Sequence, residues 1–484
     1  MIGVHQYTSA IQGGFLMKTT GVPLRTMQTM HGTRTSTMGI RTTTTGTTII
    51  GLGLLGVLAK PVPGSGLEPD SAHFIEYKQL ELFPTCLISL EKVFEAYYSC
   101  RNHKRNTLQA MDFELDLEEN IIELWRQLND CTYQIGRSSV FIVESPVKRE
   151  IFAADFRDRI VHHFIINALN PVIEKQFVYD VYACRKGKGS TLAVKRLNHF
   201  MRSCSHNYQR EGWVLKLDIR SFFMSIDKNV LFDSFASFIR EFYFKEDMEL
   251  LLRLCKLVVY NNPTHGCIVR SPASSWDLLP KDKSLFFAKE GCGLPIGNLT
   301  SQVLANFYLS TLDHYIKHNL GIRFYGRYVD DFVLVHESRS YLTECIKPIR
   351  EFLQNHLHLR LHPRKIQLQR ICHGVSFLGW SFQVGHINGG NRIISNWKKL
   401  VIQKNLLIED HRPSREEQLA FRSSTNSYLG IMSQNNTFNV RYRILCTLDF
   451  RWLRFYHPDS KCKKLVVSKT LNTKQKDSDC EVID

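Results

Sequence analysis

The chain has 484 residues, of which 43% are hydrophobic and 11% aromatic. A chain of this size can bury a large core and divide into about two to four domains or subdomains. Its formal charge of +16 and pI near 9.2 favour a polyanionic partner, nucleic acid ahead of an acidic membrane surface. No stretch is long and apolar enough to span a membrane, and the thirteen cysteines lack paired CxxC spacing. We therefore predict no membrane partner, no zinc and no disulfides.

The first 145 residues carry no chemical signal. Residues 1–67 contain no acidic side chain and are rich in Thr and Gly, which predicts a low-complexity, disordered extension. Apolar residues recur at helical spacing over 87–98 and 115–128, so we expect a helical segment at 68–145.

Two basic stretches follow. Cations alternate with apolar, strand-like residues over 148–159, and glycine mixes with Lys and Arg over 182–191. Such residues let backbone amides and cations approach phosphates closely. Taken alone, each stretch is more typical of a solvated basic loop.

The next features are a strand and a glycine-rich turn. Residues 213–219 form an apolar run that contains Asp218, a carboxylate that is costly to bury unless it is paired, bound to a metal or used as a helix cap. Residues 255–290 are predicted to be rich in loops. A glycine-rich turn over 291–302 then leads into a helix, with Asn298 or Thr300 as its N-cap.

The most informative stretch is 323–336, in which two apolar runs flank Asp330 and Asp331. This pattern predicts a β-hairpin with the two acids at its turn. Neighbouring carboxylates in apolar surroundings repel each other and lose solvation, and a divalent cation such as Mg²⁺ would offset that cost. The alternative is a polar hairpin turn without a metal.

Beyond this hairpin, alternation over 357–365 predicts an edge strand, and 374–380 resembles a second hairpin. Residues 396–456 are helical and basic in pattern, and a charged, disordered tail is expected over 457–484.

Taken in order, these motifs resemble the palm motifs of reverse transcriptases. They are Asp218 followed by Phe223, the turn at 294–297, Tyr328-Val329-Asp330-Asp331, Lys365 and the segment 377–380. The resemblance covers residues 90–455 and implies an α+β, right-hand polymerase with fingers, a palm with an antiparallel sheet, and a helical thumb. It places the fingers at 146–213, the palm at 214–380 with a fingers insertion at 255–297, and the thumb at 381–456.

More narrowly, the chain resembles the reverse transcriptases of diversity-generating retroelements. Most reverse transcriptases have Gln before the glycine of the turn, whereas this chain has Ile296 before Gly297 and continues to Gln302 in the form typical of that group. An Ile cannot donate the hydrogen bond that Gln could make near the nascent base pair, so we expect looser checking of that pair. The resemblance to this group implies errors opposite template adenines. The alternatives are a retron or phage-defence reverse transcriptase, or a catalytically inactive RNA-binding derivative.

The resemblance also assigns the chemical roles. Asp218 and Asp330 are expected to bridge two Mg²⁺ ions, with Asp331 nearby and the Ile219 carbonyl on one ion. Lys365 resembles the general acid toward pyrophosphate, although a surface Lys is nearly as good an interpretation. The residues expected to bind the incoming nucleotide are Lys148, Arg149, Arg157, Arg159, Phe223, Ile296, Gly297 and Gln302. Among these, Arg149 would grip the triphosphate and Phe223 would exclude a 2′-hydroxyl.

The implied partners are a template RNA, the RNA–DNA hybrid, deoxynucleoside triphosphates and a small helical accessory protein. The resemblance implies a cytoplasmic location, with the gene carried by a bacterium, an archaeon or a phage.

Overall fold

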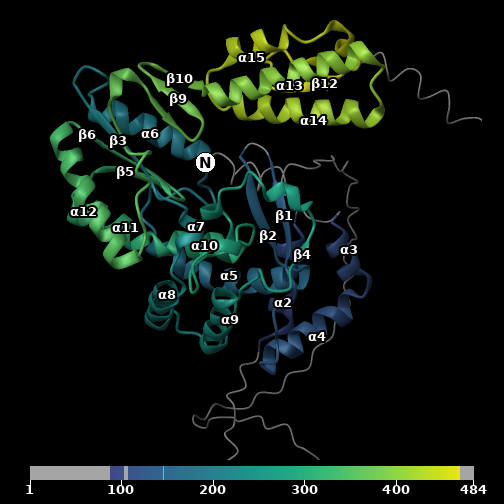
Figure 1. Cartoon of the computed structure of the whole chain (residues 1–484), viewed down its shortest axis with the longest axis vertical. Helices are drawn as coiled ribbons and strands as arrows, with labels where there is room; N and C mark the ends of the chain where they lie inside the picture. Colours follow the sequence, from purple (N-terminus) through teal and green to yellow (C-terminus); the bar gives the residue numbers. More distant parts are fainter. Residues whose placement is uncertain (1–87, 103–106, 145–146, 469–484) are drawn as a thin grey trace, which may run out of the picture. The chain divides into compact units, whose positions relative to one another are not determined.

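The computed structural model describes residues 88–102, 107–144 and 147–468 (Figure 1). The predicted extension at 1–67 and the end of the predicted tail lie outside these residues. Within the described part of the chain, no helix is both long and apolar enough to cross a membrane.

The central element is a four-stranded antiparallel sheet in the order β5-β6-β3-β7. Its strands are β3 (Trp213–Asp218), β5 (Phe324–Tyr328), β6 (Asp331–His336) and β7 (Gln367–Arg370). Strand β6 is buried except for its last residue, and β3 is buried except for Trp213 and Lys216, as befits the two central strands of the sheet. The register places Asp218 directly opposite Asp331, so the two acids meet at one end of the sheet.

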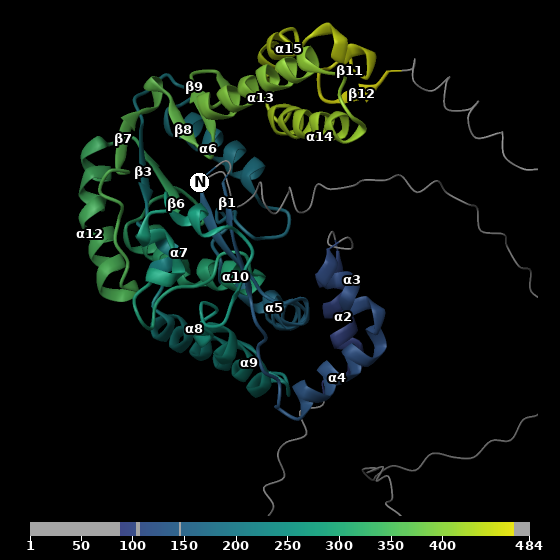
Figure 2. The ribbon, with the colours of Figure 1, turned by 45° about the vertical axis from the view of Figure 1, so that its right-hand side comes forward.

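Helices surround this sheet. Helix α12 (Arg339–Leu357) contacts β3, β6 and β7, and Figure 2 shows it running along one side of these strands. Helix α6 (Ser190–Cys204) contacts β5 and β6. The remaining helices of this part are α5 (Phe156–Gln176), α7 (Phe222–Ser225), α8 (Lys228–Phe242), α9 (Met248–Tyr260), α10 (Leu299–Tyr308) and α11 (Ser310–His314), which a π-helical turn, Tyr315–Asn319, extends.

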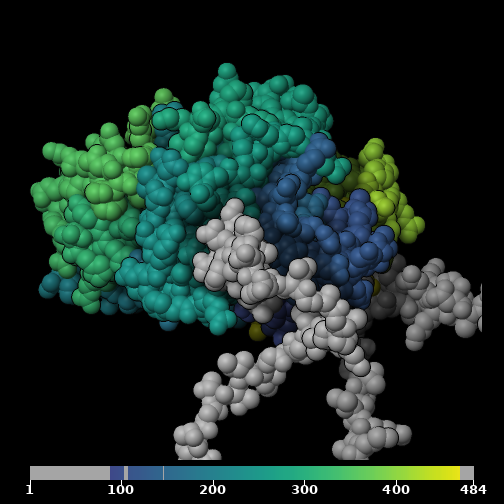
Figure 3. All heavy atoms as spheres, turned by 90° about the horizontal axis from the view of Figure 1, so that it is seen from below, coloured from purple at the N-terminus to yellow at the C-terminus, as the bar shows by residue number. Residues whose placement is uncertain are grey.

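The N-terminal helices are α2 (Leu90–Arg101), α3 (Leu108–Leu115) and α4 (Leu117–Asn129). Helix α2 packs on α5, and Lys92 bonds to Asp247, the N-cap residue of α9, over 3.0 Å. Figure 3 shows the blue atoms of these helices beside the teal atoms of the segment that contains α8 and α9. The predicted helices at 87–98 and 115–128 are thus confirmed as α2 and α4.

A second sheet has the order β2-β1-β4 and takes its strands from two separate parts of the chain. It comprises β1 (Ser139–Val143), β2 (Arg149–Ala153) and β4 (Ile268–Val269). Three short 3-10 helices follow β4, at Ala273–Trp276, Lys281–Lys283 and Leu285–Phe287. The buried carboxylate of Glu150 attaches them to β2, because it accepts hydrogen bonds from Trp276, Ser284 and Leu285 at 2.7–2.8 Å.

The C-terminal part has its own core. After a short 3-10 turn (Ile371–His373) comes the sheet of β8 (Val375–Phe377), β9 (Trp380–Gln383) and β10 (His386–Gly389), and this confirms the hairpin predicted at 374–380. Helices α13 (Asn391–Asp410), α14 (Arg415–Met432) and α15 (Phe438–Leu445) then pack around buried aromatic rings, among them Trp397, Phe421 and Trp452. The helical pattern predicted for 396–456 is confirmed over these three helices.

Four local predictions need correction. The stretch 148–159 is strand only as far as Ala153, because Asp155 caps α5 by accepting a hydrogen bond from the Arg157 amide at 3.0 Å. The stretch expected to be loop-rich from 255 begins inside α9, whose buried face extends to Val259. The edge strand expected at 357–365 is a loop that buries Leu359 and Leu361, and the edge strand is β7 instead.

The fourth correction concerns the predicted tail. Its first part forms a hairpin of β11 (Tyr456–Pro458) and β12 (Leu465–Val467), preceded by the 3-10 helix Phe450–Arg454. Leu465 is 1% exposed and belongs to the C-terminal core, so this part of the chain contributes to packing. The α+β class is confirmed.

Candidate active site

The predicted hairpin is present, and its loop consists of Val329 and Asp330. Val329 adopts a φ of +57°, a left-handed conformation that costs free energy for a β-branched residue. Such strain persists only where surrounding contacts enforce it, and it clusters at functional sites. Here it turns the chain directly before the acid pair.

The structure brings the three predicted acids together. Asp218 and Asp331 are 2% and 3% exposed and face each other across β3 and β6, while Asp330 is half-buried in the adjacent loop. The backbone oxygen of Asp330 accepts a hydrogen bond from the Ile219 amide at 3.3 Å, which joins the loop to the end of β3. The predicted metal-site residues are therefore neighbours.

Two ammonium groups compensate part of this negative charge. Lys365 donates to both carboxylate oxygens of Asp218 at 3.1 Å, and Lys216 lies 3.6 Å from one oxygen of Asp331. Lys216 was missed by sequence reasoning. Because it lies two residues before Asp218 on the same strand, the period-two alternation of strand side chains could have revealed it.

Asp330 and Asp331 nevertheless have raised pKa values. Burial, followed by repulsion from Asp218 and Asp331, raises the pKa of Asp330 to about 7. Burial also raises the pKa of Asp331 to about 6, although Lys216 opposes that rise. One oxygen of Asp331, Oδ1, is buried and has no hydrogen-bond partner within the described residues.

These observations fit a divalent cation. An orphaned buried oxygen and acids that resist ionisation are what a hard cation would satisfy, and carboxylate oxygens are the ligands Mg²⁺ prefers. Among the described side chains, no three acidic, His or Cys groups stand ready-made around a metal position. In this structure the carboxylates of Asp218 and Asp331 are paired with Lys365 and Lys216 instead.

The acids open onto a cleft of about 610 Å³. Of the residues predicted to bind the nucleotide, Lys148, Arg149, Phe223 and Ile296 line this cleft. It is also lined by cations that the sequence did not single out, which are Arg220, Lys283 and Arg392. A cleft with carboxylates on the sheet and cations around them can hold a polyphosphate together with a metal ion.

The glycine-rich turn is attached to β2. The carbonyl of Ile296 accepts a hydrogen bond from the Phe152 amide at 2.9 Å, and the Asn298 side chain accepts one from the Ala154 amide at 3.2 Å. Gly297 has a φ of +128°, and a Cβ there would lie 2.8 Å from the Phe152 carbonyl oxygen. Only glycine allows this approach, which fixes Ile296 beside the cleft.

Besides Gly297, three predicted nucleotide-binding residues do not line the cleft. Arg157 bonds to Gln127 and the Gln134 carbonyl and lies 4.9 Å from the centre of the Tyr133 ring. Arg159 bonds to the Ala154 carbonyl and to Gln109 at 2.7 and 2.6 Å. Gln302 accepts a hydrogen bond from the Cys184 thiol at 3.1 Å. Both arginines lie on α5, which begins after the Asp155 cap and directs them to the N-terminal helices.

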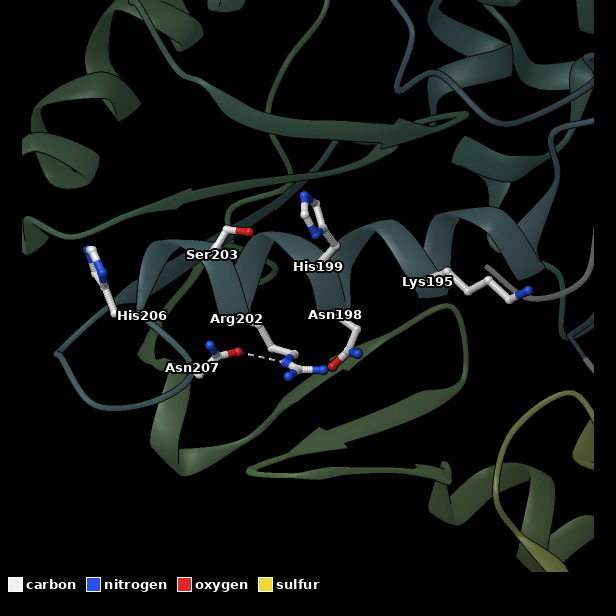
Figure 4. Close-up of a pocket in the computed structure, with 7 residues that line it drawn as sticks. All are labelled: Lys195, Asn198, His199, Arg202, Ser203, His206 and Asn207. Carbon is white, nitrogen blue, oxygen red and sulfur yellow. Dashed lines mark hydrogen bonds between the residues drawn. The ribbon is translucent and has the colours of Figure 1, made fainter.

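A separate basic hollow of about 570 Å³ lies on the outer face of α6 (Figure 4). No acid lines it, and its residues are Lys195, Asn198, His199, Arg202, Ser203, His206 and Asn207. Arg202 donates to Asn207 at 3.1 Å, as the dashed line shows. Its charge favours an anion such as a nucleic-acid backbone.

Comparisons with known proteins find similarity over the central region. Residues 148–382 match the family model described as reverse transcriptase (RNA-dependent DNA polymerase). A curated relative, protein YkfC of Escherichia coli (strain K12), is 25% identical over 273 residues, which are 50% of this chain and 65% of YkfC.

Two telomerase structures are among the similar folds. Apo telomerase from Candida tropicalis, truncated from its C-terminal domain, has a TM-score of 0.38 and 12% identity, over 53% of this chain and 55% of that chain. Telomerase from Candida albicans in complex with a TWJ fragment of telomeric RNA has a TM-score of 0.39 and 10% identity, over 66% and 61%. The chain thus spans less than two thirds of each of these relatives. With the antiparallel sheet and its acids, the family match confirms the right-hand polymerase class, and residues 148–382 are similar to a reverse transcriptase domain.

Proposed function

We propose that this protein is an RNA-directed DNA polymerase that extends a primer along an RNA template by nucleotidyl transfer. The observation that carries the proposal is the pairing of Asp218 with Asp331 across β3 and β6, with Asp330 in the adjoining loop. All three acids face a cleft that also holds cations. The reverse transcriptase domain supports the same activity.

Asp218, Asp330 and Asp331 would hold Mg²⁺, with the Ile219 carbonyl as a further ligand. Bound there, Mg²⁺ would promote deprotonation of the primer 3′-hydroxyl and neutralise the charge that develops on the leaving pyrophosphate. Lys148 and Arg149 also line the cleft. They would bind and orient the triphosphate, because the forked guanidinium suits paired phosphate oxygens.

Lys365 is placed to act as a proton donor. Its ammonium already lies 3.1 Å from both oxygens of Asp218, so it reaches the catalytic carboxylate directly. A cation held by Asp218 would compete with the ammonium for those oxygens, and Lys365, which lines the cleft, could then donate a proton to pyrophosphate. Phe223 lines the same cleft, where its ring would exclude a 2′-hydroxyl.

Primer extension on an RNA template with Mg²⁺ and deoxynucleotides tests this activity. The double variant Asp330→Asn/Asp331→Asn should lose DNA synthesis. Asp233→Asn, the same change at an exposed acid of α8, should retain it. Synthesis by the double variant, or none by the wild-type protein on any primed template, would disprove the proposal.

We infer further that synthesis is error-prone opposite template adenines, as in the diversity-generating group. Ile296 supports this inference, because it presents an aliphatic side chain to the cleft at a place where its backbone is fixed by β2. Ile296→Gln introduces a hydrogen-bond donor and an acceptor at this place. Because one hydrogen bond is worth about 0.5–1.5 kcal/mol, the variant should discriminate correct from incorrect nucleotides about two- to tenfold better.

Sequencing of cDNA copied from an adenine-rich template measures this effect, with Ile296→Val as the matched apolar control. Fewer errors at adenines in the Gln variant alone would support the inference. An unchanged error spectrum would favour the retron or phage-defence alternative. The accessory protein stays a prediction from the family resemblance, whereas the basic hollow on α6 supports a nucleic-acid partner.

A further inference from the structure

Arg327, on β5, is a fully buried cation only three residues before Asp330. Its Nε and Nη2 atoms donate to the two carboxylate oxygens of Asp313 at 2.7 and 2.6 Å, and both side chains are 0% exposed. A buried ion pair of this kind adds little net stability, because desolvation offsets the attraction. Its placement therefore needs a reason other than stability.

A further donor of Arg327 binds the loop of Val329 and Asp330, which we call the catalytic loop. Nη1 donates to the Val329 carbonyl at 3.0 Å and to the Asn306 side-chain oxygen at 3.1 Å. Val329 is the residue with the unfavourable positive φ, and its carbonyl belongs to the peptide bond that leads into Asp330. The guanidinium of Arg327 thus donates a hydrogen bond to the strained Val329 peptide, while the Asp313 carboxylate neutralises the charge of Arg327.

The backbone of Arg327 is fixed as well. Its amide donates to the Asp180 carbonyl at 2.9 Å, and its carbonyl accepts from the Tyr182 amide at 3.0 Å. The Asp180 carboxylate is in turn held by Arg196 at 2.7 Å. Both the backbone and the guanidinium of Arg327 are therefore held by several hydrogen bonds. These bonds fix the position of the donor that reaches the Val329 carbonyl.

We propose that Arg327 is a positioning residue that holds the Val329–Asp330 loop in the conformation that presents the Asp330 carboxylate for metal binding and catalysis. The proposal rests on the function proposed above and goes beyond it, because Arg327 is fully buried and does not line the cleft. Holding the loop before the ion arrives removes an ordering cost from each catalytic cycle.

The same network provides a matched control. The Tyr325 hydroxyl donates to the Asp313 carboxylate at 2.6 Å, whereas the Val329 carbonyl accepts its hydrogen bond from Arg327. Tyr325→Phe therefore weakens the buried network without releasing Val329. Arg327→Lys keeps the charge opposite Asp313 but is too short and has too few donors to reach both Asp313 and the Val329 carbonyl.

The experiment compares the wild-type chain, Arg327→Lys and Tyr325→Phe by thermal unfolding, steady-state primer extension and Mn²⁺ binding followed by electron paramagnetic resonance. We expect Arg327→Lys to lower kcat about ten- to a hundredfold, the loss of one hydrogen bond to a charged group, with the KM for primer–template unchanged. It should also weaken Mn²⁺ binding about tenfold. Tyr325→Phe should lower the Tm but keep kcat and Mn²⁺ affinity within about twofold of wild type.

The outcomes are distinguishable. If both variants lose activity only in proportion to lost folded protein, or if Arg327→Lys keeps wild-type kcat and Mn²⁺ affinity, the network is structural and the inference is wrong. If the wild-type chain makes no DNA, the proposed function fails instead. Should Arg327→Lys not fold, Asn306→Ala takes its place. It removes one partner of Nη1 and spares the Asp313 pair, so we expect the same pattern with a smaller effect.

Discussion

Asp330→Asn should stabilise the metal-free protein while abolishing catalysis. Asp330 is half-buried beside Asp218 and Asp331, and burial with their repulsion raises its pKa from 3.8 to about 7. Between these two values the folded state binds more protons than the unfolded state. The free energy of unfolding contributed by this group is therefore fully present below about pH 4 and is lost as the pH rises toward 7.

The size of the effect follows from that shift. A difference of about three pKa units corresponds to about 4 kcal/mol at pH 8, which is an upper value because water and counterions screen a half-buried group. At pH 5 the same calculation gives a destabilisation of the folded wild-type protein of less than about 2 kcal/mol. Asn carries no charge at any pH, so the variant should escape this penalty.

Denaturant unfolding in the presence of EDTA at pH 5, 6.5 and 8 measures the difference. We expect the variant to be more stable than wild type, by an amount that grows with pH. Added Mg²⁺ should narrow the gap, since a cation that binds only folded wild-type protein stabilises it by mass action. Asp233→Asn, at an exposed site, should show no such trend. This electrostatic reasoning would be refuted if the two proteins had the same free energy of unfolding at pH 8. It would also be refuted if their difference in free energy of unfolding were equal at pH 5 and pH 8.

Two further predictions concern the wall of the cleft. Glu150→Gln should destabilise the protein by about 2–4 kcal/mol, because the new amide NH₂ would face a donor from Trp276, Ser284 or Leu285. It should also raise the KM for deoxynucleotides, because it loosens the strand that carries Arg149. Denaturant unfolding and steady-state kinetics measure the two effects, and unchanged values of both would contradict the anchoring role. Gly297→Ala should lower kcat/KM for the nucleotide, because its Cβ would meet the Phe152 carbonyl oxygen at 2.8 Å. Wild-type kinetics in that variant would show that the turn can move without cost.

Local patterns in the sequence were enough to locate the acids. The apolar runs of β3, β5 and β6 identify strands, and the acids at their ends stand out because a carboxylate there is costly without a partner. The helix after Asn298 and the hairpin at 374–380 were predictable for the same reason, since spacing and turn residues act over only a few positions.

Long-range pairing decided the rest. No local pattern shows that Lys365 lies on Asp218, 147 positions away, or that Glu150 anchors a segment more than 120 positions later. Arg157 and Arg159 looked like cleft residues, yet the start of α5 after Asp155 turns them to other partners.

The sequence by itself determined which residues of this protein could perform the chemistry: two strands and a turn carry Asp218, Asp330 and Asp331, because strand and turn preferences depend on neighbours in the chain. Only the tertiary structure decided what holds those acids in place. The partner of a buried charge is set by topology, and the Asp313–Arg327 pair meets the catalytic loop only once β5 and α11 have come together.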